Sequence, residues 1–255
     1  MLENSIKDID LTFWKRVMTH YFVYLILYVC FSVALMYFFP SEFSVTILFL
    51  IGGIGFGSLY FKIKKQFTIE FGKSIGFTYS QTAPIESVSG KLFSLGNAKM
   101  ILDVLSGIYE NIPIRIFTYF FQESGNDSNK IFLTVFEVTL EGNVPNLFLC
   151  SNKSKAFNFN WDKNVTPLVL EGDFNKYFNL HVLKDYEQEA YQILTPDVMV
   201  KLIDLAHELN FEFIGNKLYI YTTRLITKKS EMERVFNLSK YLISLFYKNT
   251  TKIKV

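Results

Sequence analysis

The sequence is poor in the residue types that build covalent frameworks and metal sites. Its 255 residues include only two cysteines and three histidines. Cys30 lies in an apolar run and Cys150 is far along the chain, so we expect no disulfide framework. His20, His181 and His207 are far apart, and none has a Cys or a second His at metal-ligand spacing. The sequence therefore predicts no metal site and no cofactor.

Charge of either sign is also scarce. Charged residues make up 20% of the chain, and the formal net charge is +2. A nucleic-acid-binding domain normally carries a broad excess of Lys and Arg, so we expect no nucleic-acid partner. Apolar residues make up 50% of the chain, which is high for a purely soluble protein once the positive mean hydropathy is considered. Much of this apolar excess falls within residues 17–61.

Two long uncharged runs fill that region. Residues 17–39 carry no charge unless His20 is protonated, and residues 43–61 carry none. As helices they would be about 34 and about 28 Å long, which suits a hydrocarbon core of about 30 Å. The short connection Pro40-Ser41-Glu42 then predicts an antiparallel transmembrane hairpin. A buried hairpin in a soluble core is the alternative, which the flanking basic residues disfavour.

Basic residues at the ends of the runs indicate the orientation. Lys15 and Arg16 precede the first run, Lys62, Lys64 and Lys65 follow the second, and the connecting loop has none. Because Lys and Arg near a span stay in the cytoplasm, both termini of this multi-pass cell-membrane protein are predicted to be cytoplasmic. The predicted organisation is a cytoplasmic segment (1–16), a transmembrane hairpin (17–61), a basic helical connector (62–76) and a cytoplasmic domain (77–255).

The glycine-rich stretch GGIGFG in the second run allows two interpretations. A dinucleotide-binding loop requires a third glycine where this sequence has Ser58, and it requires a preceding strand rather than a long span. Gly53 and Gly57 instead form a Gly-x-x-x-Gly pair, which lets a second helix approach closely in a membrane. We expect the partner to be the first span, through Ser32 or Ala34, or the second span of another copy.

Ser74 lies in a Gly-x-Ser-x-Gly sequence, which resembles the nucleophile elbow of hydrolases. That elbow needs a strand before the serine and a helix after it. Here a helical segment precedes Ser74 and the strand-like Phe77-Thr78-Tyr79 follows it, although His181 and His207 lie downstream as conceivable bases. We predict a helix that ends at glycines, with a serine hydrolase as the less favoured alternative.

The residues after Gly76 predict an α+β fold, in which helices pack on a mixed, mainly antiparallel sheet. Residues 99–122 predict two strands that turn near Glu110-Asn111, and residues 130–140 alternate apolar and polar side chains over much of their length. Residues 146–150 and 166–170 predict further short strands. The sequence FEFIGNKLYIYTTR predicts a hairpin with its turn at Gly215-Asn216.

Two amphipathic helices are predicted near the C-terminus. Thr195, Pro196 and Asp197 supply an N-cap, a first-turn proline and a first-turn acid for a helix that reaches about Leu209. Residues 230–233 form a capping box for a second helix. Its apolar stripe consists of Val235, Leu238, Leu242, Leu245 and Phe246.

Three segments carry a resemblance to a known family: GDFNKYFNLHV (172–182), LTPDVMVKLIDLA (194–206) and NKLYIY (216–221). Over residues 165–222 the chain resembles the uncharacterised bacterial membrane proteins grouped as domain of unknown function 3137. That resemblance implies two adjacent spans followed by an α+β region, and it brings no catalytic residues. The positions that match, all with packing or capping roles, are Phe174, Phe178, Leu194, Thr195, Pro196, Met199, Leu202, Leu218 and Tyr219.

These features together predict a membrane-anchored cytoplasmic interaction or scaffold protein without catalytic activity. Its expected partners are the lipid bilayer and either another protein or a second copy, bound through the spans. The first alternative is a lipid- or small-molecule-binding module at the membrane surface, which would need a pocket within residues 77–226. The second is a serine hydrolase that uses Ser74.

Overall fold

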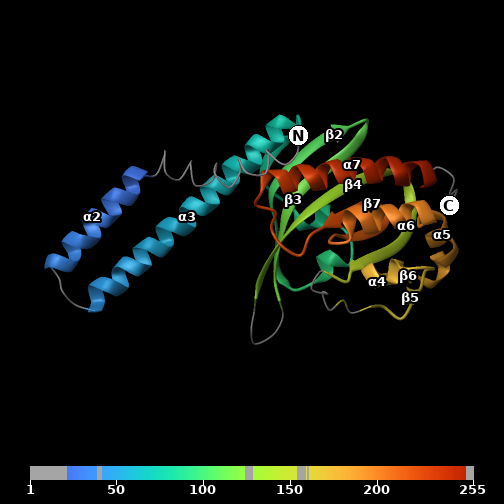
Figure 1. The fold of residues 1–255 in the computed structure, drawn as a ribbon, viewed down its shortest axis with the longest axis horizontal. Helices are drawn as coiled ribbons and strands as arrows, with labels where there is room; N and C mark the ends of the chain where they lie inside the picture. Colours follow the sequence, from blue (N-terminus) through green and yellow to red (C-terminus); the bar gives the residue numbers. More distant parts are fainter. Residues whose placement is uncertain (1–21, 39–41, 124–128, 154–158, 160, 251–255) are drawn as a thin grey trace. The chain divides into compact units, whose positions relative to one another are not determined.

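A computed structural model describes residues 22–38, 42–123, 129–153, 159 and 161–250, which form two compact units (Figure 1). The first unit comprises the chain up to Phe71 together with Thr227–Ser230. The second comprises Gly72–Ile226 and the residues from Glu231 onward.

Two helices make up most of the described residues of the first unit. Helix α2 (Phe22–Phe38) lies within the first apolar run, and helix α3 (Glu42–Ser74) continues from the second run through the basic residues that follow it. In the part of the chain that the structure describes, no helix is both long and apolar enough to cross a membrane. Large apolar side chains of α2 are nevertheless exposed: Phe22, Val23, Tyr24, Ile26, Leu27, Val29, Phe31, Val33, Met36 and Tyr37.

The second unit is built on a seven-stranded sheet, and its described pairings are all antiparallel. The predicted α+β class, with helices on a mainly antiparallel sheet, is therefore confirmed. The spatial order is β1-β2-β3-β4-β6-β5, and β7 also pairs with β4. The strands are β1 (Thr78–Ala83), β2 (Asn97–Tyr109), β3 (Ile112–Gln122), β4 (Lys130–Ser151), β5 (Val165–Leu168), β6 (Phe178–Leu183) and β7 (Asn210–Tyr221).

The predicted turn near Glu110-Asn111 is confirmed. Strand β2 ends at Tyr109 and β3 begins at Ile112, so these two residues alone connect the strands. Both have positive φ, +48° for Glu110 and +68° for Asn111. Two consecutive positive φ values match the twist of a two-residue hairpin turn.

Strand β4 is the centre of the sheet and is longer than predicted. The segments 130–140 and 146–150 were expected as separate strands, but both belong to β4. They stay in one strand because β7 pairs along both of them. The exposed residues Glu141–Asn143 form a bulge, where the register shifts between Thr139 and Val144. On its other edge, β4 pairs first with β3 and then with β6.

The predicted hairpin at Gly215-Asn216 is wrong, because β7 passes through these residues as one strand along β4. Gly215 has φ +57°, and the register of β7 against β4 shifts on both sides of it. A glycine in this conformation changes which alternate side chains face a given layer. On the face of the sheet covered by residues 84–96, the side chain that points outward is Glu212 before Gly215 and Tyr219 after it.

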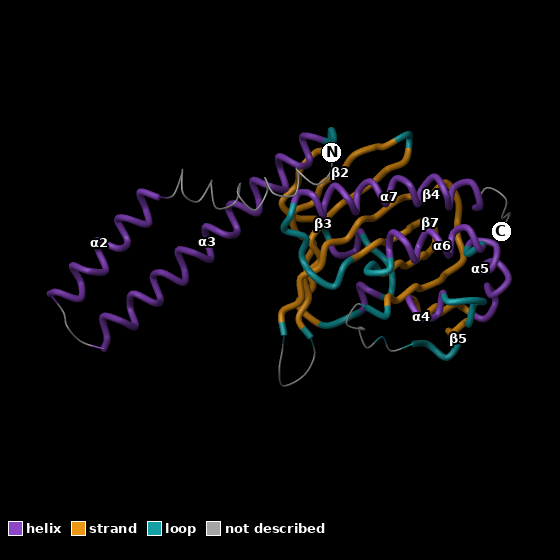
Figure 2. Tube along the Cα trace, viewed as in Figure 1, coloured by secondary structure: helices purple, strands orange, loops and turns teal. Residues whose placement is uncertain are grey.

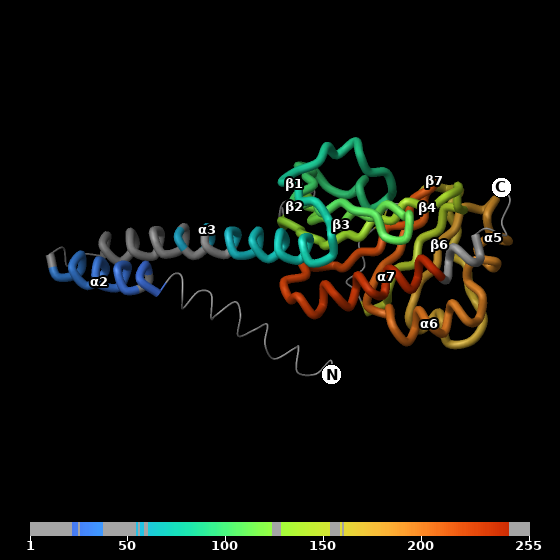
Figure 3. The backbone as a smooth tube through the Cα atoms, turned by 90° about the horizontal axis from the view of Figure 1, so that it is seen from above, coloured from blue at the N-terminus to red at the C-terminus, as the bar shows by residue number. Residues whose placement is uncertain are grey.

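Helices and a long connection cover opposite faces of the sheet. Figure 2 shows α6 (Pro196–Ala206) and α7 (Lys229–Thr250) running across the strands. Residues 84–96, which connect β1 to β2, lie on the other face (Figure 3). We call this connection the β1–β2 strap; it contains the 3-10 helices η1 (Ile85–Ser87) and η2 (Leu92–Ser94). The remaining helices are α4 (Phe174–Tyr177), η3 (Lys184–Tyr186) and α5 (Glu187–Ile193).

Local signals predicted the two long C-terminal helices, but their capping differs from the prediction. Thr195 occupies the N-cap position of α6 and Pro196 its first turn, yet the Thr195 side chain makes no capping hydrogen bond. Helix α6 ends at Ala206 rather than near Leu209, because the chain then enters β7 at Asn210. Helix α7 begins at Lys229, so Ser230 is already helical instead of being the N-cap.

Both faces of the sheet bury apolar side chains. In the predicted stripe of α7, Val235, Leu238 and Leu242 are buried; the side chains of Leu245 and Phe246 lie outside the described residues. Beneath the strap, the ring of Phe93 lies 5.0 Å from that of Tyr119 and 4.9 Å from that of Tyr219. These rings belong to a core cluster of Leu92, Phe93, Ile101, Val104, Phe117, Tyr119, Phe121, Leu133, Val135, Tyr219 and Tyr221.

Candidate functional site

A buried carboxylate on β7 fastens the β1–β2 strap to the sheet. The side chain of Glu212 is fully buried, and Oε2 accepts a hydrogen bond of 3.0 Å from the backbone N–H of Leu92. Oε1 accepts another from the N–H of Lys91. Burial raises the pKa of Glu212 to about 7, although these two N–H groups and the Lys91 charge act in the opposite direction. Glu212 therefore titrates near neutral pH.

Gly90 is required where the strap crosses this carboxylate. Its φ is +134°, a conformation that residues with a side chain rarely adopt. A Cβ atom at this position would also lie 2.5 Å from Glu212 Oε1. The close approach of the Gly90 backbone thus brings the next two N–H groups onto the carboxylate.

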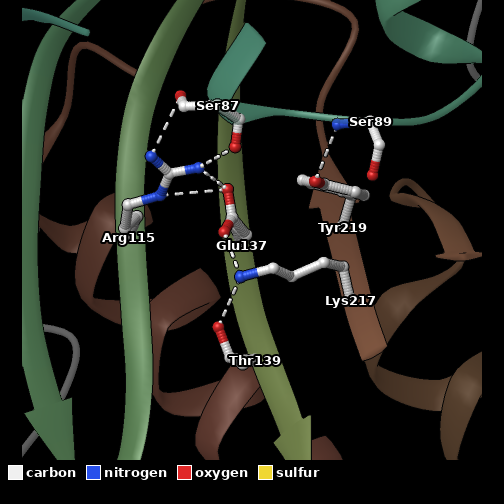
Figure 4. A network of polar contacts seen from close by, with 7 residues as sticks. All are labelled: Ser87, Ser89, Arg115, Glu137, Thr139, Lys217 and Tyr219. Atoms are coloured by element: carbon white, nitrogen blue, oxygen red, sulfur yellow. Dashed lines mark hydrogen bonds and ion pairs between the residues drawn. The ribbon is translucent and has the colours of Figure 1, made fainter. Parts of the chain in front are cut away.

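A second buried carboxylate, Glu137, lies between two cations in the same layer (Figure 4). Arg115 Nε donates to Glu137 Oε2 at 3.1 Å, and Arg115 Nη2 contacts the same oxygen. Lys217 Nζ lies 2.9 Å from Oε1. These residues come from β3, β4 and β7, and the register pairs Arg115 directly with Glu137. The ion triad therefore joins three strands.

The triad also reaches the strap and its surroundings. Arg115 donates to the Ser87 carbonyl oxygen at 2.9 Å and to the Ser87 hydroxyl at 3.2 Å. The N–H of Ser89 donates to the Tyr219 hydroxyl at 3.3 Å. Lys217 Nζ donates to Thr139 Oγ1 at 2.7 Å. Two buried carboxylates thus hold the strap on the sheet: Glu212 directly, and Glu137 through Arg115.

The charge and protonation states of these buried groups suit stabilisation of the fold better than proton transfer or nucleophilic attack. Both oxygens of Glu137 are occupied by cations, which leaves the carboxylate poorly placed to accept a proton from a substrate. The pKa of the Cys150 thiol is raised to about 12, mainly by burial and secondarily by the charge of Glu212. A thiol in that state is a weak nucleophile. Burial also raises the pKa of Tyr221, which stays protonated.

His181 and Ser74 lie in settings that differ from those of a metal site and of a nucleophile elbow. No group of three or more His, Cys, Asp or Glu side chains in the described residues is placed to hold a metal ion. The ring of His181 stacks on Trp161 with 4.4 Å between centroids, and burial lowers the pKa of His181. Ser74 ends α3 and is followed by β1. That order, helix before strand, is the reverse of a nucleophile elbow.

A polar pocket of about 380 Å³ lies where both ends of β7 approach the beginning of α7. Leu209 precedes β7 and Thr222 follows it, yet both line the pocket. A straight strand of this length would separate them by about 40 Å, so the β4–β7 ribbon is strongly bent. The lining residues are Lys153, Glu208, Leu209, Thr222, Thr223, Arg224, Glu231 and Arg234.

The charged side chains of the pocket differ in how fully they are paired. Arg224 binds Glu231 through two hydrogen bonds of 2.6 and 3.1 Å. Arg234 lies 3.8 Å from Glu208, which is an ion pair beyond hydrogen-bond distance. Lys153 Nζ lies 2.9 Å from Nε2 of His207, whose Nδ1 lies 2.8 Å from the Ile203 carbonyl oxygen.

The residues singled out by the family resemblance lie mainly in the core. Phe174 begins α4 and Phe178 begins β6, and their rings stack at 5.1 Å. Leu194, Leu202 and Leu218 are buried as well. Tyr219 is buried and also binds the strap through its hydroxyl, whereas Thr195, Pro196 and Met199 lie at the partly exposed start of α6.

The residues assigned to the membrane hairpin are described in part. Lys15 and Arg16 lie outside the described residues, whereas Lys62, Lys64 and Lys65 lie on α3. Gly53 lies in α3, but its surroundings are outside the described residues. A Cβ atom added at Gly57 would meet no described atom within 4 Å. Within the described part of this chain, nothing packs closely against that glycine.

Sequence reasoning missed the charged residues beneath the strap and around the pocket. Arg115, Glu137 and Glu212 each interrupt an apolar strand sequence: IPIRIF, TVFEV and FEF. A lone charge inside such a strand was the available signal, because a buried charge needs a partner. The identity of the partner depends on strand register, which the sequence alone did not supply.

Comparison with known proteins reveals a similarity of fold. No protein-family model matches the chain, and no curated protein sequence matches it. A crystal structure of the mycobacterial trehalose monomycolate transport factor A, TtfA, has a TM-score of 0.53 at 10% sequence identity. The match covers 71% of this chain and 95% of that chain. The chain therefore shares an α+β fold with this transport factor.

Proposed function

We propose that the chain is a membrane-anchored interaction protein, whose α+β unit serves a lipid-handling assembly on the cytoplasmic side. The observation that carries the proposal is the exposed apolar surface of α2. At about 3.6 residues per turn, its ten exposed large apolar residues extend around the whole helix. A helix that is apolar all round is typical of a membrane span or a fully buried core helix.

The sequence on either side of α2 supports a membrane hairpin. The uncharged runs 17–39 and 43–61 extend beyond α2 and into α3, and each has a length suited to a bilayer. Basic residues flank the pair of runs at both outer ends. Gly53 and Gly57 then supply a surface for close helix association, with a second copy as the favoured partner because no described atom lies within 4 Å of a Cβ built at Gly57.

The similarity to TtfA supports the lipid-related part of the proposal. By its name, TtfA is a factor for the transport of trehalose monomycolate. A shared fold does not imply a shared substrate. From the similarity to TtfA we therefore infer only the general class of process, the handling of lipids. An accessory role without catalysis agrees with the paired or neutral state of the buried Glu137, Cys150 and Tyr221.

Membrane extraction of the full chain tests the anchor. We expect the chain to stay in the membrane pellet after alkaline carbonate washing and to dissolve in detergent. The double substitution Val29→Lys and Val33→Lys places two charges on α2 and should move the chain to the soluble fraction, because a charge at the centre of a span costs about 3 kcal/mol.

A matched control places the same charges on exposed apolar positions of the other unit. Ile108 and Val169 are 71% and 76% exposed, and Ile108→Lys with Val169→Lys should leave membrane retention unchanged. Release of the unsubstituted chain by carbonate would refute the anchor. Crosslinking in the membrane, followed by affinity purification, tests the interaction role; a consistent lack of any crosslinked partner or second copy would count against it.

A further inference from the structure

We propose that the polar pocket between β7 and α7 binds the phosphate group of an organic phosphate. Its volume of about 380 Å³ falls within the range of about 300–1,000 Å³ that is common for small-ligand sites. The pocket lies wholly within the second unit. Phosphate binding there goes beyond the proposed membrane anchoring and does not depend on it.

The charges that line the pocket favour an anion. Three cations, Lys153, Arg224 and Arg234, face two carboxylates, Glu208 and Glu231. Arg224 and Glu231 neutralise each other through their two hydrogen bonds. Two cations and one carboxylate are left, so the rest of the pocket carries a net positive charge.

Arg234 keeps its hydrogen-bonding capacity. Its contact with Glu208 spans 3.8 Å, and no described residue accepts a hydrogen bond from its guanidinium group. The Arg234 side chain is 49% exposed and that of Glu208 is 56% exposed, so the pair is weak. A guanidinium group with free donors is well suited to a phosphate, because it binds two oxygens at once.

Lys153 keeps its charge uncompensated among the described residues. Nδ1 of His207 lies 2.8 Å from the carbonyl oxygen of Ile203, which can only accept, so the hydrogen of a neutral ring is on Nδ1. Nε2 then presents a lone pair to the Lys153 ammonium group at 2.9 Å. This contact orients Lys153 without neutralising it, since the ring supplies no negative charge.

The uncharged lining residues complete the site. Thr222 donates its hydroxyl hydrogen to the Arg224 carbonyl oxygen, whereas the hydroxyl of Thr223 has no partner among the described residues. Thr223 can therefore donate to a phosphate oxygen. Leu209 supplies an apolar wall for the organic part of the ligand. A divalent cation fits less well, because both carboxylates already face arginines.

Titration calorimetry on the full chain in a neutral detergent tests the proposal. The probes are inorganic phosphate, glycerol phosphate and a short-chain phosphatidylglycerol, with glycerol and acetate as comparators at constant ionic strength. We expect saturable binding of the phosphate probes and none of glycerol. Tighter binding of phosphatidylglycerol than of glycerol phosphate would identify a lipid head group as the ligand; equal binding would identify a soluble phosphate ester.

Substitutions that are expected to weaken binding, and one that is expected to strengthen it, test whether phosphate binds in this pocket. Lys153→Gln and Arg234→Gln should each weaken phosphate binding about tenfold, which corresponds to the loss of one charge-assisted hydrogen bond of about 1.4 kcal/mol. Glu208→Gln removes the remaining negative charge and should strengthen binding about two- to fivefold. Lys201→Gln, at an exposed lysine of α6 outside the pocket, should change nothing.

Several results would overturn the proposal. These are no binding of any phosphate probe, acetate binding as tight as phosphate binding, or equal weakening by Lys201→Gln and Lys153→Gln. Unchanged affinity in Glu208→Gln together with unchanged affinity in Arg234→Gln would also overturn it. Loss of membrane retention in the carbonate test would contradict the anchor and leave this result unaffected, so the two proposals fail separately.

Discussion

At the scale of single residues, two buried carboxylates under the same strap are compensated in different ways. Glu137 is balanced by the charges of Arg115 and Lys217, while Glu212 is balanced chiefly by two backbone N–H groups. The two N–H groups do not offset the burial of Glu212, so the pKa of its carboxyl is raised. Glu212 therefore makes the stability of the strap depend on pH.

We expect the free energy of unfolding to fall as pH rises from about 4.5 to about 7. The pKa of Glu212 is about 7 in the folded chain against 4.5 for an ordinary glutamate, so the folded state binds more protons in this range. The stabilisation is fully present below the lower value and is lost as pH rises through the upper one. The total is of the order of 3 kcal/mol at 1.36 kcal/mol per pH unit.

Urea unfolding in detergent, followed by tryptophan fluorescence at several pH values, measures this dependence. Glu212→Gln removes the titrating group and should flatten the pH profile over that range. Glu171→Gln, at an exposed glutamate, should keep the slope of the parent chain. A parent profile that rises with pH over this interval would show that another group dominates.

The Arg115–Glu137 contact should appear as a strong coupling between the two residues. Glu137→Ala leaves two partly buried cations without their carboxylate and should cost about 3 kcal/mol of stability. Because the side chains of Arg115 and Lys217 are 24% and 26% exposed, water can recover part of this loss. A double-mutant cycle with Arg115→Ala should give a coupling of about 1–3 kcal/mol; additive effects would mean that the contact contributes little.

Gly90→Ala should destabilise the second unit by more than about 1 kcal/mol, since the residue has positive φ and no room for a Cβ atom. Gly142 offers the matched control. A Cβ atom there meets nothing within 4 Å, and its φ is not positive, so Gly142→Ala should change the unfolding midpoint little. Equal losses in both variants would contradict the role of close backbone approach at Gly90.

At the scale of elements, the sequence predicted those that rest on local chemistry. The β2–β3 turn and the helix after Pro196 were predictable because two or three neighbouring residues determine them. Strand β7 was not, since a glycine with positive φ serves a hairpin turn and a bulge equally well. Pairing with β4, far away in the sequence, decided between the two.

Helix α3 gives a prediction of its own at this scale. A side chain at Gly57 has room within the described part of a single chain, so Gly57→Leu should leave the fold intact. If Gly53 and Gly57 pack against a second copy, the same substitution should reduce crosslinked dimer in the membrane severalfold. Ser58→Leu, at an exposed position next to Gly57, is the control. Unchanged crosslinking in Gly57→Leu would leave the glycines without a packing role.

At the scale of the whole molecule, orientation is the property that the sequence predicts most directly. Basic residues at both outer ends of the apolar runs predict a cytoplasmic C-terminus. A fluorescent protein fused after Val255 should therefore fluoresce in a bacterial host, and an alkaline phosphatase fused there should be inactive. The opposite pair of results would invert the topology.

The candidate pocket lay beyond the reach of sequence reasoning at this same scale. Lys153 and Arg234 are 81 positions apart in the sequence, and no local pattern connects them. They meet because the β4–β7 ribbon bends, so that the residues after β7 return to those before it. The α+β class followed from periodicity, whereas this meeting depends on the bend of the β4–β7 ribbon, which no local sequence pattern predicted.

The positive φ of Gly215, together with the strap contacts of Glu212 and Tyr219, means that β7 consists of two half-strands out of phase. If β7 instead ran through Gly215 with regular alternation, Glu212 and Tyr219, which lie seven positions apart, would face opposite layers. Leu218 and Ile220 would then face the strap, and the Tyr219 and Tyr221 hydroxyls would enter the layer covered by helices. One backbone angle thus decides which side chains of β7 meet the strap and which enter the layer covered by helices, so a residue that cannot adopt the positive φ of Gly215 would be more damaging here than at most exposed positions.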